Sequence, residues 1–168
     1  MSPALEEKQV LLSALSGQRE HVLHALEGLD TQDLRRSVLP SGWSCLGLVN
    51  HLSLDVERFW FQAVVSGDEG AIEGVLRASD TAWNVSGDER GEDVLRRYKE
   101  NAERADAIIA SHSLESAPAW WPDFFGSWRL DSLREIVIHV VIEVATHAGH
   151  LDAARELIDG KQHLVLTD

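Results

Sequence analysis

Apolar residues recur at helical spacing in four long stretches of the chain. These stretches cover about residues 4–29, 45–66, 92–111 and 132–159. In each stretch the apolar positions lie three or four residues apart, which is typical of an amphipathic helix. The first shows the pattern with Leu11, Leu15, Val22, Leu26 and Leu29. Because no segment requires a strand, the pattern predicts an all-α fold.

Capping residues mark where these helices begin and end. Ser44 is a candidate N-cap for the second helix. Ser132 and Glu135 have the spacing of a capping box at the start of the fourth, and Gly160 is a candidate C-cap at its end. Residues 68–90 are rich in glycine and aspartate and predict at most one weak helix, around AIEGVLRA.

The fourth stretch is apolar almost all round between residues 133 and 145, which predicts a central, buried helix. Its segment IVIHVVIEV is rich in β-branched residues and has the composition of a buried strand. However, no turn signal separates this segment from the helical residues that follow, and its polar positions keep a helical phase. We therefore predict a helix.

Four polar residues interrupt this apolar helix. At about 100° per residue, His139, Glu143, His147 and His150 project from one arc of the helix. Burying a lone carboxylate is costly unless something pairs with it, and a divalent metal satisfies a carboxylate flanked by imidazoles. The alternative is a set of polar core groups that bond one another or face a wet groove. The apolar setting favours the metal.

A third metal ligand must come from another helix, and His51 is the best candidate. Asp55, one turn later on the same face, is a candidate to orient its imidazole ring. The alternative is a partly exposed histidine that pairs with Asp55. Cys45 is interpreted as a small buried hydrophobe. We interpret the remaining histidines as surface residues: His21, His24, His112 and His163.

Length, charge and cysteine content restrict the class of protein. The chain has 168 residues, which predicts a single domain over 1–168. Lys and Arg number 15 against 28 Asp and Glu, for a net charge of −13. Such a surface repels phosphate, so nucleic acid and membrane are not expected partners. One cysteine excludes an internal disulfide. No apolar run is as long as a membrane span, and the acidic N-terminus does not resemble a signal peptide, so we expect a cytoplasmic location.

Two segments resemble those of a known superfamily. SGWSCLGLVNHL and RLDSLREIVIHVVIEVATHAGHLDAARELIDG are similar, in this order, to motifs of the DinB/YfiT-like metalloenzymes. The resemblance covers nearly the whole chain. It is closest to the mycothiol-dependent branch, which includes maleylpyruvate isomerase N-terminal-like domains and the mini-circle proteins. It implies an up-down four-helix bundle with a long crossover and one divalent metal at one end.

Carried over residue by residue, the resemblance places the metal ligands on His51, Glu143 and His147. Most of the superfamily has a histidine at the position of Glu143. The isomerase branch, like this chain, has a glutamate there. The ion expected is Zn²⁺, with Ni²⁺ or Fe²⁺ as alternatives. The role of His150 stays open between fourth ligand, proton shuttle and pocket wall, and we take it as the candidate catalytic acid or base.

The expected function is activation of a low-molecular-weight, mycothiol-like thiol as co-substrate. The thiol would be transferred to a small-molecule electrophile, or would assist its isomerisation. Candidate substrate-binding residues are Trp43, Trp121, Trp128 and His139. The alternative is a non-catalytic metal-binding helical module that acts in protein–protein interaction.

An aromatic segment precedes the fourth helix, within residues 118–128. Its large side chains are Trp120, Trp121, Phe124, Phe125 and Trp128. Each hides much apolar surface when buried, so we do not expect all five to be left in water. A core plug, a wall of the substrate site and the interface of a homodimer are the three alternatives.

Overall fold

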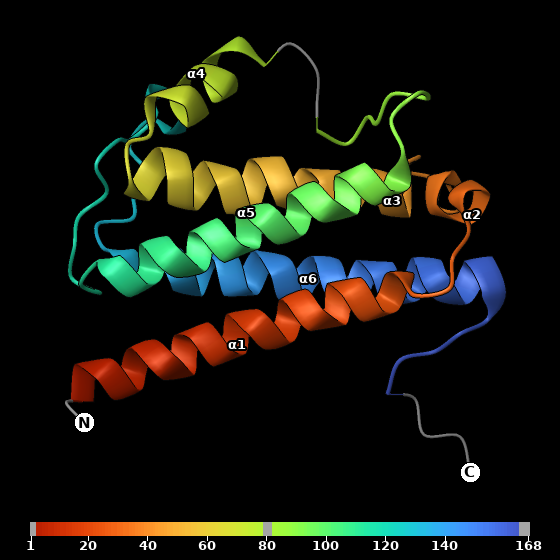
Figure 1. Cartoon of the computed structure of the whole chain (residues 1–168), viewed down its shortest axis with the longest axis horizontal. Coiled ribbons are helices and arrows are strands. Elements are labelled where there is room, and N and C mark those ends of the chain that lie inside the picture. The colour runs from red at the N-terminus through yellow and green to blue at the C-terminus, as the bar shows by residue number, and fades with distance from the viewer. Residues whose placement is uncertain (1–2, 79–81, 165–168) are drawn as a thin grey trace.

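The computed structural model describes residues 3–78 and 82–164. Four long helical segments lie side by side (Figure 1): α1 (Pro3–Leu26), α3 (Cys45–His51) continued by η1 (Leu52–Val65), α5 (Gly91–Ser111) and α6 (Leu133–Asp159). The connections hold α2 (Thr31–Arg35), α4 (Glu69–Arg77) and one 3₁₀ turn, η2 (Asp123–Phe125). Within the described ranges no strand occurs beyond an isolated bridge between Ser37 and Ser44. The predicted all-α fold is confirmed.

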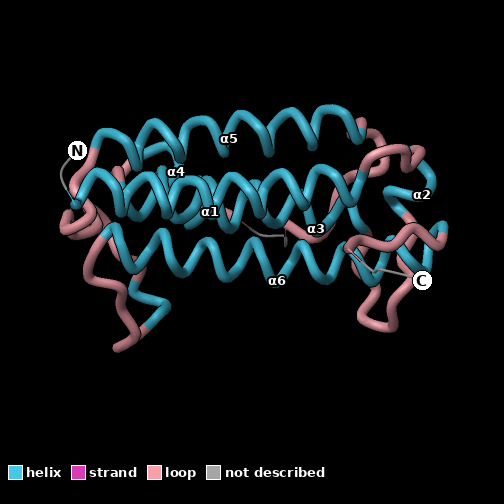
Figure 2. The backbone as a smooth tube through the Cα atoms, turned by 90° about the horizontal axis from the view of Figure 1, so that it is seen from below, coloured by secondary structure: helices cyan, strands magenta, loops and turns pink. Residues whose placement is uncertain are grey.

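The four long segments do not simply alternate in direction. The colours of Figure 1 show α1 and α6 running one way, and the α3–η1 segment and α5 the other way. Two parallel segments in succession need a long connection, which the crossover around α4 provides. In Figure 2, α1 lies in front with α5 on one side and α6 on the other. α1 packs chiefly against α6, and α5 against η1.

The capping residues act as the sequence predicts. The Ser44 hydroxyl accepts a 3.1 Å hydrogen bond from the backbone N–H of Gly47 at the start of α3. Ser132 and Glu135 form the reciprocal capping box at the start of α6. Gly160 ends α6 with a φ of 79°, a left-handed conformation that glycine adopts without strain. The segment IVIHVVIEV, whose β-branched residues are also typical of a strand, is helical throughout, as predicted.

The second long segment changes its helical type along its length. It is α-helical up to His51 and π-helical from Leu52 to Val65, a run of 14 residues. π-Helical geometry in proteins is mostly confined to single-turn bulges at functional sites. Apolar spacing predicted one ordinary helix here. Most side chains of η1 are buried, so the wider backbone packs against neighbours on nearly all sides.

The structure corrects the prediction that α6 is buried all round. One face is buried throughout and carries Leu133, Ile136, Val137, Val140, Val144, Ala148, Leu151 and Ala154. The opposite side exposes 42% of Ile138 and 59% of Ile142. The cause is the packing of α6 against α1 and η1, which leaves part of its surface uncovered. The apolar composition of α6 therefore did not predict which of its sides other helices cover.

Of the helices in the described residues, α6 alone has the length and mean hydropathy that would allow it to cross a membrane. The expectation from apolar runs was that no segment would meet such a criterion. Core helices of folded proteins often have the same properties, and α6 buries one side against α1 and η1.

Backbone hydrogen bonds join the aromatic segment to the end of η1. The backbone N–H groups of Ala119 and Trp120 donate to the carbonyls of Val65 and Val64. Trp120, Trp121 and Phe125 are partly buried against the core. By contrast, Phe124 and Trp128 are exposed, so the segment is not a plain core plug.

A buried ion pair joins three of the long segments. Glu57 of η1 is completely buried, and Arg19 of α1 donates to both of its carboxylate oxygens at 2.7 Å. Arg19 also donates to Asp106 of α5 at 2.7 Å. This paired, bidentate arrangement compensates for removing the charges from water.

Replacing Glu57 by Gln should destabilise the fold by about 3–5 kcal/mol, because Arg19 would keep a buried charge with only Asp106 to balance it. The free energy of unfolding would be measured by denaturant titration. The double variant Arg19→Met/Glu57→Leu, which removes both charges, should lose less than the single variant. An exposed control, Glu100→Gln, should leave stability unchanged. A loss no larger for Glu57→Gln than for the control would contradict this account.

Candidate metal centre

His51, Glu143 and His147 come together between α3 and α6. Each offers one ligand atom, and these atoms all lie within 4.8 Å of one another. The His147 Nε2 atom is 3.6 Å from a Glu143 oxygen, and the His51 and His147 rings meet edge to face with centroids 5.1 Å apart. Glu143 and His147 lie near the middle of α6, not at one end of the molecule as the resemblance implied.

Two contacts hold the His51 ring in place. Its Nδ1 atom is 2.9 Å from Oδ2 of Asp55, one turn further along. Trp83 stacks on the ring at a centroid distance of 4.3 Å, with the planes 16° apart. Because Nδ1 is engaged by the carboxylate, Nε2 is the nitrogen left for a ligand. Asp55 thus has the orienting position that its spacing predicted.

Trp83 reaches His51 because Gly47 has no side chain. A Cβ atom on Gly47 would lie 2.2 Å from the Trp83 carbonyl oxygen, so only glycine allows this close approach. The Asn50 side chain also donates to the Ala82 carbonyl at 2.8 Å. These contacts place the crossover on α3. The sequence prediction missed Trp83 and Asn50; the one available signal was a tryptophan in an otherwise polar segment.

Burial favours the neutral form of two imidazoles on α6, those of His139 and His147. Desolvation lowers the pKa of His147, His51 lowers it further, and Glu143 partly offsets both. Desolvation also lowers the pKa of His139, again offset in part by Glu143. A neutral imidazole is the form that ligates a metal.

The donor set fits a divalent transition metal. Two imidazole nitrogens and one carboxylate oxygen suit Zn²⁺, Ni²⁺ or Fe²⁺ better than Mg²⁺ or Ca²⁺. Bonds of about 2.0–2.1 Å in a tetrahedral site separate neighbouring ligand atoms by roughly 3.3 Å, close to the 3.6 Å between His147 and Glu143. The His147 side chain is 12% exposed and Glu143 37%, so the cluster opens to solvent on the carboxylate side.

His150 and Trp43 lie beside the cluster on its C-terminal side. The Nδ1 atom of His150 is 3.4 Å from Nδ1 of His147, and the residue is exposed. The Trp43 ring lies 6.3 Å from the rings of both His150 and Trp83. Both residues therefore lie next to His147, and the exposed His150 is within reach of a substrate.

His139 lies one turn before Glu143 and faces an aromatic wall. Its ring is 4.8 Å from Trp60, edge to face, and 5.6 Å from Trp128. Trp121 continues the wall, 5.7 Å from Trp128 and 5.9 Å from Trp60. The Nε1 atom of Trp121 is buried without a hydrogen-bond partner within the described ranges. The three predicted substrate-binding residues on this side are thus contiguous.

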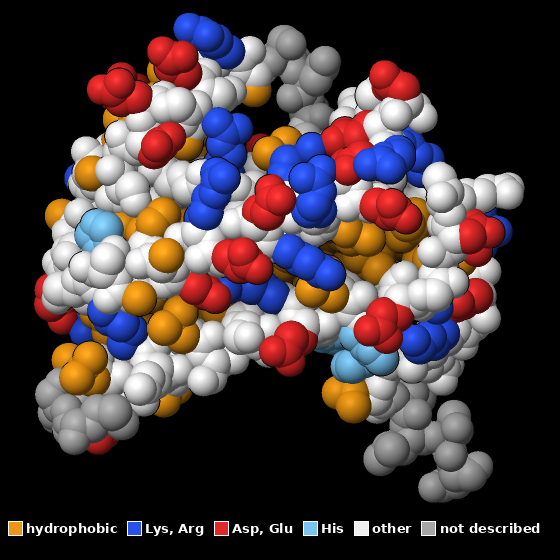
Figure 3. Space-filling model, viewed as in Figure 1, with side chains coloured by type: hydrophobic (Ala, Val, Ile, Leu, Met, Phe, Trp, Pro, Cys, Tyr) orange, Lys and Arg blue, Asp and Glu red, His pale blue; other side chains and the backbone are white. Residues whose placement is uncertain are grey.

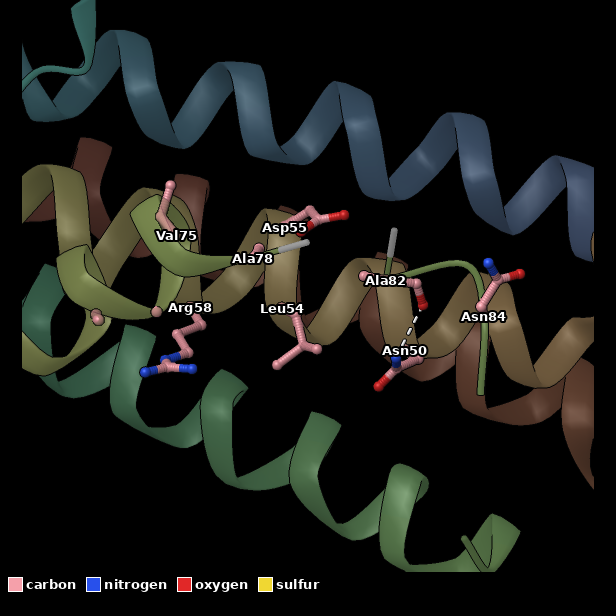
Figure 4. Close-up of a pocket in the computed structure, with 10 residues that line it drawn as sticks. Asn50, Leu54, Asp55, Arg58, Val75, Ala78, Ala82 and Asn84 are labelled. Carbon is pink, nitrogen blue, oxygen red and sulfur yellow. Dashed lines mark hydrogen bonds between the residues drawn. The ribbon is translucent and has the colours of Figure 1, made fainter. Parts of the chain in front are cut away.

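A pocket of about 260 Å³ adjoins the cluster on the far side of Asp55. Polar side chains line it together with small apolar ones, and the polar ones are Asn50, Asp55, Arg58 and Asn84. Figure 4 shows Asp55 pointing from η1 towards α6, and Arg58 pointing to the opposite side. Asp55 therefore belongs to both places: it lines the pocket and contacts His51 of the candidate metal centre.

Cys45 has the buried role that the sequence predicted. It is 2% exposed, and burial raises the pKa of its thiol to about 11. A thiol with so high a pKa is a poor nucleophile at neutral pH.

The surface interpretation of the remaining histidines holds only in part. His24 and His112 lie at helix ends, as predicted. His21 and His163, however, come together with Asp152 in a second cluster. The two histidines are 142 positions apart, so no local spacing could indicate their contact.

The fold and the cluster define a helical protein with a candidate divalent-metal centre of two histidines and one glutamate. Compared with models of protein families, the chain matches the one described as Mycothiol-S-transferase over residues 10–160. The chain therefore belongs to the mycothiol-S-transferase family, which is DinB/YfiT-like, and the resemblance seen in the sequence is confirmed. No curated protein and no solved structure matches it.

In metal-free protein, His139 and His147 should titrate below the ordinary histidine pKa of about 6.5. Glu143→Gln should lower both pKa values further, because it removes the negative charge that favours the imidazolium form. The imidazole signals would be followed by NMR against pH, with His112 as the unaffected reference. Since the unfolded chain binds more protons, both histidines should destabilise the fold as pH falls below 6.5. A rise of either pKa in Glu143→Gln would contradict the arrangement.

Proposed function

We propose that this protein is a metal-dependent enzyme that activates a mycothiol-like thiol and transfers it to a small electrophile. The observation that carries the proposal is the convergence of His51, Glu143 and His147 from two helices in a member of the mycothiol-S-transferase family. Three protein donors leave a coordination position open, as in catalytic sites rather than structural ones.

In this proposal the three side chains hold the ion, and Asp55 orients His51 through its Nδ1 atom. A bound divalent ion supplies a Lewis acid that lowers the pKa of a thiol and favours its thiolate form. The donor set of two imidazoles and one carboxylate suits Zn²⁺, Ni²⁺ and Fe²⁺, and we propose Zn²⁺.

His150 takes the part of the acid–base residue. It is exposed beside His147 and is not required as a ligand by the three-donor cluster. Its imidazole accepts the proton of the incoming thiol and returns it to the leaving group of the electrophile. The sulfur forms the new bond to carbon as the leaving group departs.

In this proposal, one neighbouring surface binds the thiol and another binds the electrophile. The pocket beside Asp55 offers the polar side chains of Arg58 and Asn84 to the polar part of the thiol. The wall of His139, Trp121 and Trp128, together with Trp43 across the centre, offers apolar surface to the electrophile. A small-molecule reaction in the cytoplasm is consistent with the acidic surface, which repels nucleic acid and anionic membranes.

The alternative function is a non-catalytic module in which the metal has a structural role. The exposed apolar residues Phe124, Trp128, Ile138 and Ile142 favour it, because they offer a surface to a partner protein or to a second copy of the chain. This alternative predicts no turnover with any thiol, so one activity assay separates the two functions.

Glu143→Gln and His51→Gln should each remove one metal ion per chain, because a site of three donors loses most of its affinity with any one of them. Metal content would be measured by elemental analysis of protein purified without a histidine tag. Glu103→Gln, an exposed residue of α5, is the matched control and should keep the metal. Equal metal content in Glu143→Gln and wild type would exclude Glu143 as a ligand.

The metal-loaded protein should transfer a thiol to a bimane electrophile, and mycothiol should be preferred over bacillithiol, glutathione and cysteine. His150→Gln should retain the metal and lose about 10²-fold or more in kcat, in line with loss of an acid–base group. His112→Gln, remote from the centre, is the control. If metal-loaded protein is no faster than metal-stripped protein with every thiol, the module alternative is correct.

A further inference from the structure

A second cluster of metal-ligand side chains lies where α1, α6 and the C-terminal segment meet. His21 of α1, Asp152 of α6 and His163 each offer one ligand atom, and these atoms lie within 4.8 Å of one another. Figure 3 shows histidine side chains gathered where the end of α1 approaches the C-terminal segment. Each of the three residues is partly buried, so none is a freely moving surface side chain.

The side chains already have the mutual arrangement of ligands. The His21 Nε2 atom is 3.0 and 2.9 Å from the two Asp152 oxygens. The His21 and His163 rings stack at 3.9 Å, with planes 26° apart, so their edges can face one ion. Hydrogen bonding between His21 and Asp152 accounts for the first contact but does not explain why a second imidazole lies against the pair.

Two cations, Arg155 and Lys161, lie near this cluster. Arg155, next to it on α6, is engaged by Asp159 and by the carbonyls of Ala25 and Glu27. His24 lies one turn from His21, with its ring 5.8 Å from His163, and its Nδ1 atom contacts Glu27. The carboxylate of Asp152 is therefore not taken by Arg155 and faces His21.

This cluster is separate from the first one. Asp152 follows Glu143 by nine residues, which at about 100° per residue places it half a turn away on the opposite face of α6. The rise of 1.5 Å per residue adds about 14 Å along the helix axis. No ion could be shared between the two.

We propose that His21, Asp152 and His163 form a second divalent-metal site, which takes Zn²⁺ and fastens the C-terminal segment to α1 and α6. Two imidazole nitrogens and a carboxylate are a donor set for Zn²⁺ rather than for Mg²⁺ or Ca²⁺. His163 lies four residues beyond the end of α6. An ion there would join three parts of the chain that are distant in sequence. The site is independent of the proposed activity.

The test is a zinc titration of chelator-stripped, tag-free protein by calorimetry. Wild type should bind one more zinc ion than His163→Ala, and His112→Ala should bind as many as wild type. Glu143→Gln should lose only the ion of the first centre, so a failure there is distinguishable from a failure here. His163 lies outside the helices, so its replacement does not endanger the fold.

A second measurement follows the segment itself. Trypsin cleaves after Lys161, two residues before His163. Zinc at about 100 times its dissociation constant should slow this cleavage by up to about 100-fold in wild type, because only the closed segment binds the ion. His163→Ala should be cleaved at the same rate with and without zinc. Unchanged stoichiometry in His163→Ala, or cleavage of wild type that zinc does not slow, would overturn the proposal.

Discussion

The carboxylate of Glu57 is completely buried in η1, and Arg19 of α1 neutralises it with two hydrogen bonds of 2.7 Å. Neither charge can leave the interior without its partner, so α1 and η1 have one register in which both are satisfied. The contact of Arg19 with Asp106 extends the constraint to α5. Because His51 directly precedes η1, the pairing that fixes η1 also fixes the position of the His51 imidazole along α6.

Much of this fold could be predicted because its signals are local. Helix caps such as Ser44, Ser132 and Gly160 act on residues within one turn, and apolar spacing is a property of a single helix. The polar stripe on α6 is local as well, and it indicated Glu143 and His147 before any partner was known. His51 came from the same kind of reasoning, with an acidic residue one turn away.

What could not be predicted depends on contacts between distant segments. Trp83 contacts His51 because a glycine four residues before that histidine leaves room for a carbonyl group, and no periodicity in the crossover encodes this. The π-helical geometry of η1 also lacks a local signature, since its apolar residues suit either helix type. The uncovered side of α6, at Ile138 and Ile142, reflects the arrangement of its neighbours rather than its own composition.

Helix α6 is therefore used on more than one side. Its apolar face packs against α1 and η1, whereas Glu143 and His147 meet His51. Because a helix advances by about 100° per residue, a few positions are enough to separate these surfaces. The regular spacing of one long helix thus links the packing of the fold to the chemistry of its candidate centre.

The burial of Cys45 has a consequence for the chemical durability of the protein. Electrophiles and thiol oxidants attack accessible thiolates. The only sulfhydryl of this chain is 2% exposed, and burial raises its pKa to about 11. The thiol of the folded protein is thereby shielded from alkylation and mixed-disulfide formation.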